Sequence, residues 1–297
     1  MISKKTPIFK GIATALITPF LDSGGVDFNS MAGLIDLQLE SNVAALVICG
    51  TTGEAPTLSA REQLSLIEFA VRRVNGLIPI IAGTGSNCTK KAIELSKSAE
   101  SAGADALLTV TPYYNKASND GLILHYLSIA DRVSVPIILY NVPSRTGMDI
   151  PLEVYKVLAR HKRIVALKEA RGNTDTAYKL VESETDLHLY SGNDIGICDM
   201  LDAGALGCIS VASNVIPKEM AGLCELYFAG CIDEARELEK KFSPLFSALF
   251  CEVNPIPVKH ALYRMGLCRP TMRLPLCPPA TTSAETIDGA LKNHGLI

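Results

Sequence analysis

The sequence predicts a (β/α)8 (TIM) barrel of the α/β class, followed by a helical C-terminal extension. Short apolar runs rich in strand-forming residues recur eight times before residue 216, helix-like segments separate them, and only helical patterns follow. Alternation of this kind is typical of a closed parallel barrel. An open doubly wound sheet is the alternative, but it normally carries a glycine-rich dinucleotide motif after its first strand. The first run here leads instead into Pro19 and Phe20.

The eight predicted strands are short and almost continuously apolar, as expected for strands that are buried on both faces. They span residues 11–18, 43–49, 78–82, 106–110, 136–140, 164–168, 187–190 and 206–211. Two of the helices between them have clear start signals, a capping box at Ser59 and Glu62 and a proline at position 151 in the first turn. The predicted barrel helices span residues 28–40, 61–74, 89–102, 120–133, 151–160, 174–184 and 194–203.

The alternation stops at residue 216, and the rest of the chain reads as helices with a proline-rich break at 269–279. No flexible linker precedes this part, so we expect it to pack on the barrel rather than to move freely. The predicted domains are a barrel over 1–215 and an extension over 216–297, with helices at 217–228, 233–250, 255–265 and 283–293.

Composition narrows the functional classes. The 297 residues are 48% hydrophobic and 20% charged with a net charge of −3, so a large core is expected and disorder is not. No Lys/Arg-rich run is present, which argues against nucleic acid or an anionic membrane as a partner. Residues 1–10 contain no apolar signal segment. The nine cysteines are scattered without a C-x-x-C, and the five histidines are spread singly. We therefore expect free, mostly buried thiols in a cytoplasmic protein, and no metal site.

Polar residues follow the predicted strands, and the active site of a barrel lies at the C-terminal ends of its strands. The sixth strand runs directly into Lys168, where the surroundings can favour a neutral, nucleophilic amine. The less specific interpretation is that Lys168 pairs with Glu169 at the edge of the sheet. The other candidates at strand ends are Thr51, Thr52, Tyr113, Tyr114, Tyr140, Arg145, Gly192 and Ile209.

These residue types together favour amine catalysis. An amine nucleophile needs a carbonyl substrate, a proton donor such as Tyr140, and donors for a carboxylate such as Arg145 or the amides of a Gly-Thr-Thr-Gly turn. A metal hydrolase would require His and Asp ligands at the strand ends, and no histidine is there. A glycosidase would require a carboxylate pair, and Glu54 and Glu169 are the only acids expected nearby.

Four motifs carry a family resemblance that covers nearly the whole chain. G-T-T-G-E at 50–54, P-Y-Y at 112–114, Y-N-V-P-S-R-T-G at 140–147 and L-K-E at 167–169 resemble the pyruvate-dependent class I aldolase family. The resemblance implies a TIM barrel, a covalent Schiff base with pyruvate, and no metal or organic cofactor. It also implies condensation of pyruvate with aspartate semialdehyde, in the branch that leads to diaminopimelate and lysine.

The resemblance assigns the chemistry to four residues. It implies that Lys168 forms the Schiff base and that Tyr140 is the acid–base, linked to Thr51 and Tyr114 in a proton relay. In the family the second tyrosine comes from a neighbouring subunit, so the chain is expected to form a homo-oligomer, most simply a tetramer built as a dimer of dimers.

The resemblance also assigns the binding residues. It implies that Thr52 and Ile209 hold pyruvate through main-chain groups, that Gly192 lines the pocket, and that Arg145 grips the carboxylate of aspartate semialdehyde. The alternative activity is that of a relative acting on a keto-sugar acid such as N-acetylneuraminate. A short substrate with a terminal carboxylate calls for a guanidinium, whereas a polyol calls for hydroxyl and amide partners, so Arg145 favours the first. A non-catalytic binding barrel is disfavoured because Lys168 and Tyr140 are both present.

Regulation is expected to differ from part of the family. Lysine-inhibited members carry histidines where this chain has Ala60 and Gln63, and a glutamate where it has Lys91, although Asn87 and Tyr113 match. A cationic ligand would meet an ammonium instead of a carboxylate, which weakens its binding. The sequence therefore predicts an enzyme that is insensitive, or nearly so, to lysine.

Overall fold

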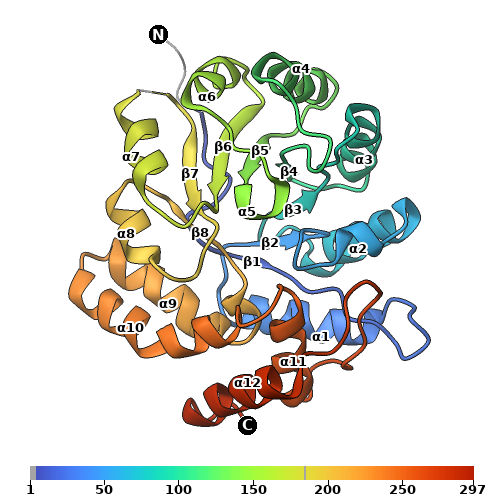
Figure 1. The fold of residues 1–297 in the computed structure, drawn as a ribbon, viewed down its shortest axis with the longest axis vertical. Coiled ribbons are helices and arrows are strands. Elements are labelled where there is room, and N and C mark those ends of the chain that lie inside the picture. The colour runs from blue at the N-terminus through green and yellow to red at the C-terminus, as the bar shows by residue number, and fades with distance from the viewer. Residues whose placement is uncertain (1–4, 184) are drawn as a thin grey trace.

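The chain forms a closed barrel of eight parallel strands ringed by helices, so the predicted fold class is confirmed (Figure 1). The computed structural model describes residues 5–183 and 185–297. Each strand pairs with its neighbours in the sequence, and β1 pairs with β8 to close the barrel. The strands are β1 Gly11–Ala15, β2 Ala45–Ile48, β3 Ile80–Gly83, β4 Ala106–Val110, β5 Ile137–Asn141, β6 Ile164–Glu169, β7 His188–Ser191 and β8 Gly207–Ser210.

The helices follow the expected order, with differences at some of their ends and one additional short helix after β5. The helix predicted over 194–203 begins only at Ile197, because Gly196 has a left-handed φ of 80° and the carboxylate of Asp194 bonds elsewhere. The helix predicted to end at Glu184 reaches outside the described residues. The barrel helices are α1 Phe28–Glu40, α2 Ala60–Val74, α3 Thr89–Ser101, α4 Asn119–Ala130, α5 Pro143–Thr146, α6 Leu152–Leu158, α7 Asp175–Glu182 and α8 Ile197–Asp202.

Two apolar layers hold the barrel together. Side chains that point outward from the strands pack against the helices in a large core that includes Leu46, Leu107 and Leu167. A smaller cluster fills the barrel interior and includes Ile138, Tyr140 and Ile209. Successive residues of a strand point to opposite faces, so Leu167 supports the outer layer while Lys168 points inward. The outer core thereby fixes the strand that carries the lysine.

Helices of the C-terminal part contact elements of the barrel. This part comprises α9 Pro217–Phe228, α10 Ile232–Ala248, α11 Ile256–Arg264 and α12 Thr281–Asn293, drawn in orange to red in Figure 1. Helix α9 follows β8 and contacts β1 and α1, α10 contacts α8 and α9, and α12 contacts both α10 and α11. The domain boundary after residue 215 stays a prediction. None of the described helices is long and apolar enough to span a membrane.

Candidate active site

Lys168 and Tyr140 are direct neighbours on adjacent strands. Their Cα positions are paired in the register of β5 and β6, and the Nζ of Lys168 lies 4.5 Å from the centre of the Tyr140 ring. Both side chains are buried, with exposed fractions of 5% and 7%. The strand pairing brings an amine and a phenol together at the C-terminal end of the barrel, which is where an amine nucleophile and its proton donor are needed.

These two residues line a cavity of about 180 Å³ at the mouth of the barrel. This volume suits a small substrate of a few heavy atoms more than a large one. Thr51, Thr52 and Arg145 also line the cavity, as does Gly192. Six of the eight predicted site residues are therefore gathered around one cavity, although they come from four different strand ends.

The Thr51–Thr52 turn follows β2 and has a constrained backbone. Cys49 and Glu54, on either side of the turn, have left-handed φ values of 57° and 54°. Such conformations are costly for residues other than glycine and persist only where the surroundings enforce them. The hydroxyl oxygen of Thr52 accepts a hydrogen bond of 3.0 Å from the side-chain amide of Asn254. The turn is thus held from the C-terminal part of the chain.

Arg145 lies on α5, a single helical turn where the sequence analysis predicted no helix. Pro143 begins this turn and Gly147 ends it with a φ of 65°. Proline in the first turn and glycine just past the end are recognised helix signals. The P-S-R-T-G motif therefore contains the signals from which this helical turn could have been predicted. The Nη2 of Arg145 donates a hydrogen bond of 3.2 Å to the carbonyl oxygen of Asn254. This contact holds the guanidinium at the rim of the cavity.

Gly192 occupies a place where no side chain fits. A Cβ at this position would lie 2.6 Å from the Cβ of Ala170 and 2.9 Å from the carbonyl oxygen of Glu169. The amide of Gly192 donates a 2.7 Å hydrogen bond to that carbonyl. Glycine therefore allows the loop after β7 to close against the end of β6, next to Lys168.

The remaining two predicted residues do not line this cavity. Ile209 is fully buried on β8, inside the barrel. Tyr114 has a left-handed φ of 70° and an exposed fraction of 92%, whereas Tyr113 lines a neighbouring cavity of about 310 Å³. Within one chain, the structure therefore does not bring Tyr114 to Lys168. The role of Tyr114 stays a prediction that requires a second copy of the chain.

The acidic residues near the strand ends are engaged in structural contacts. Glu169 accepts hydrogen bonds from the side-chain amide of Asn141 and the backbone amide of Arg171, and burial raises the pKa of its carboxyl group. Burial likewise raises the pKa of Asp194, whose carboxylate accepts the amides of Val211 and Ala212. Neither residue lines the cavity beside Lys168. A glycosidase-type carboxylate pair is thus absent among the residues that line it.

Sequence reasoning gave no indication that the C-terminal part contributes to the cavity wall. Phe250 and Asn254 come from the C-terminal part and close the cavity on the side of Thr52 and Arg145. Both follow α10, more than eighty residues after Lys168 in the chain. Nothing in their local sequence indicates this position, because it results from the packing of the C-terminal helices. Among the described residues, no group of three or more His, Cys, Asp and Glu side chains is arranged to hold a metal ion.

Comparison with known proteins decides the family. Residues 8–294 match the model of the dihydrodipicolinate synthetase family. The chain belongs to this family. A relative from Caldicellulosiruptor saccharolyticus, named 4-hydroxy-tetrahydrodipicolinate synthase, is 47% identical over 290 residues, and the match covers 98% of each chain. The resemblance inferred from the four motifs is confirmed.

Solved structures of the dihydrodipicolinate synthetase family share the fold over the whole chain. The dihydrodipicolinate synthase of Acinetobacter baumannii, described as chloride-inhibited and complexed with pyruvate, has a TM-score of 0.95 and 44% identity, and the match covers 98% of this chain and 100% of that one. The enzyme of Cyanidioschyzon merolae, with lysine bound, has a TM-score of 0.94 and 36% identity over 98% of this chain and 100% of that one.

Proposed function

We propose that this chain condenses pyruvate with L-aspartate 4-semialdehyde to give 4-hydroxy-tetrahydrodipicolinate, a step of lysine and diaminopimelate biosynthesis. The observation that carries the proposal is the pairing of Lys168 with Tyr140 at a cavity whose rim holds Arg145. Relatives that match over the full length bear the name of this activity. The enzyme is a Schiff-base-forming lyase of the aldolase type.

The chemistry begins at Lys168. Its neutral amine adds to the ketone carbon of pyruvate, and loss of water gives a protonated imine. Removal of a proton from the methyl group gives an enamine, whose carbon attacks the aldehyde of the second substrate. The amino group of that substrate then displaces the lysine by transimination, which closes the six-membered ring and frees Lys168. Tyr140 supplies and removes protons, with Thr51 as its partner in the relay.

Binding is assigned to the cavity wall. Backbone groups of Thr52 and Ile209 hold the carboxylate and imine of pyruvate, and Gly192 leaves room beside them. Arg145 receives the carboxylate of aspartate semialdehyde, because a planar guanidinium binds a carboxylate through two parallel hydrogen bonds. The chemistry requires neither a metal nor an organic cofactor. The protonated imine itself accepts the electron pair released when the methyl group loses its proton, so no metal is needed to polarise the carbonyl group.

A second copy of the chain completes the relay in this proposal. The support is the exposure of Tyr114, a large aromatic side chain that projects from a loop with a left-handed backbone. Exposed aromatic side chains are enriched at interfaces between proteins. We propose a homo-oligomer, a tetramer built as a dimer of dimers, in which Tyr114 of one subunit reaches the site of its neighbour. The proposed location is the cytoplasm.

Product formation from competing substrates tests the activity. Purified protein is incubated with pyruvate and either aspartate semialdehyde or N-acetylmannosamine, the second being the aldehyde partner of the sugar-acid alternative. We expect rapid cyclic product with aspartate semialdehyde and no condensation with the amino sugar. Condensation with N-acetylmannosamine at a comparable kcat/KM would assign the chain to the alternative activity.

A further inference from the structure

A fully buried ion pair links the turn that carries Thr51 and Thr52 to the C-terminal part of the chain. The Nζ of Lys259, on α11, lies 2.5 Å from the Oε1 of Glu54, and both side chains have an exposed fraction of 0%. The Lys259 ammonium also lies 4.3 Å from the centre of the Phe20 ring. Two charges are removed from water only at a high cost, so each depends on the other. Neither residue takes part in the proposed chemistry.

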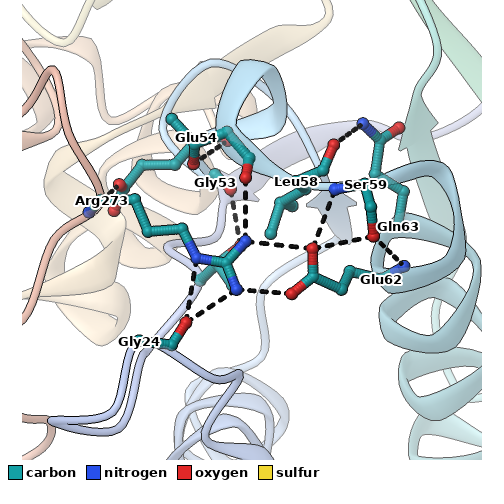
Figure 2. A network of polar contacts seen from close by, with 10 residues as sticks. Gly24, Gly53, Glu54, Leu58, Ser59, Glu62, Gln63 and Arg273 are labelled. Carbon is teal, nitrogen blue, oxygen red and sulfur yellow. Dashed lines mark hydrogen bonds and ion pairs between the residues drawn. The ribbon is translucent and has the colours of Figure 1, made fainter.

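Arg273 forms a second connection around the same turn. Its guanidinium donates hydrogen bonds to the carbonyl oxygen of Gly24 at 2.7 and 3.0 Å and to that of Thr57 at 2.8 Å (Figure 2). It also pairs with Glu62 at the start of α2, which lowers the pKa of that carboxyl group to about 2. Its backbone amide donates to the Oε2 of Glu54 at 3.3 Å. Both oxygens of the Glu54 carboxylate are thereby held by the C-terminal part.

The anchored segment has a conformation that it would not adopt alone. Glu54 itself has the left-handed φ of 54°, and Cys49 has one of 57°. Thr51 and Thr52 lie between these two residues, so their positions depend on both ends of the turn. A buried carboxylate with a fixed pair of partners is a means of enforcing such backbone geometry. The contacts of Lys259 and Arg273 act at one of the two constrained ends.

We propose that Lys259 and Arg273 are positioning residues of the active site, which hold the Thr51–Thr52 turn in the geometry that binds pyruvate. Lys259 acts through the carboxylate of Glu54, and the guanidinium of Arg273 acts through the carbonyl oxygen of Thr57, just after the turn. The proposal rests on the proposed function, because it names what the turn does. It assigns a role to the C-terminal part, which contributes Phe250 and Asn254, from the segment between α10 and α11, to the cavity wall but holds none of the reacting groups. Loss of either side chain lets the turn relax. This weakens the binding of pyruvate more than the binding of the second substrate.

Kinetics of the full-length chain test the proposal with two variants and a matched control. Lys259→Met removes the side chain that pairs with the carboxylate of Glu54, and Arg273→Ala removes the guanidinium that holds Thr57 and Glu62 just after the turn. The control is Lys5→Met, since Lys5 is also a largely buried ion-pair lysine, bonded to Asp186 before β7 and thus at the opposite end of the barrel. A displacement of about 1 Å in a binding group costs up to about a hundredfold in rate. We expect both variants to raise the KM for pyruvate about tenfold or more, and the control to leave it unchanged.

Hydrogen exchange of the backbone amides over 50–58 provides the second readout, which is independent of catalysis. We expect faster exchange there in both variants and wild-type exchange in Lys5→Met. If Lys259→Met does not fold, Arg273→Ala decides the question. Folded variants with a wild-type KM for pyruvate and wild-type exchange over 50–58 would overturn the proposal. If the wild-type chain forms no adduct with pyruvate, the proposed function fails, and the exchange comparison still decides whether these residues hold the turn.

Discussion

Removal of the Arg145 side chain is expected to separate the two substrates. Arg145→Ala deletes a guanidinium that has one hydrogen bond to protein among the described residues, at 3.2 Å to the carbonyl oxygen of Asn254. Its other donors remain available for a carboxylate. A charge-assisted, bidentate contact contributes about 2–3 kcal/mol, which corresponds to a loss on the order of a hundredfold in kcat/KM for aspartate semialdehyde. Arg145→Lys keeps the charge but cannot form the two parallel hydrogen bonds of a guanidinium. Its loss in kcat/KM is therefore expected to lie between that of Arg145→Ala and wild type.

The assay is a steady-state measurement of both substrates in each variant, together with the rate at which borohydride traps the pyruvate adduct. The adduct forms before the second substrate binds, so its rate is expected to stay within about threefold of wild type in both Arg145 variants. A collapse of adduct formation that equals the loss in kcat/KM for aspartate semialdehyde would show that Arg145 acts on pyruvate or on the turn, and would refute the assignment.

The other predictions follow from single contacts. Gly192→Ala places a Cβ 2.6 Å from its nearest neighbour and is expected to slow adduct formation more than about tenfold. Gly222→Ala, whose Cβ meets nothing within 4 Å, is expected to be neutral. Equal rates in the two variants would contradict the close-approach argument. Tyr114→Phe and Lys168→Arg are each expected to be nearly inactive. Refolding the two variants together is expected to restore activity, because a mixed oligomer contains a site with both groups intact. No recovery would show that Tyr114 does not serve the site of a neighbouring subunit. Free lysine is expected to leave activity unchanged into the millimolar range, because Lys91 lines the cavity that adjoins the site; a titration with half-inhibition at micromolar lysine would contradict this.

The fold and most of the candidate site could be predicted because their signals are local. Buried parallel strands read as short apolar runs, and the barrel topology brings residues at successive strand ends together. Lys168 and Tyr140 are found by this rule alone, since adjacent strands place them side by side. Some element boundaries differ from the predicted ones: β1 ends at Ala15 rather than residue 18, and α8 begins later than its apolar pattern suggests.

The contribution of the C-terminal part could not be predicted from the sequence. Asn254 and Lys259 contact Thr52 and Glu54, which lie more than two hundred residues earlier in the chain. Only the tertiary packing brings these residues together. Glu54 illustrates the limit, because the sequence indicates an acid close to the site but not that its charge is neutralised by a buried lysine. Polar residues in buried pairs look the same in a sequence as polar residues that contact a substrate.

Trapping of the pyruvate adduct tests the central claim most directly. The wild-type chain is incubated with pyruvate, reduced with borohydride, digested and mapped by mass spectrometry, beside Lys168→Arg, which keeps the positive charge but offers no neutral amine. The account predicts one modified peptide, labelled at Lys168, and no label in the variant. An adduct of undiminished yield in Lys168→Arg, or a label on another lysine in the wild-type chain, would contradict the account.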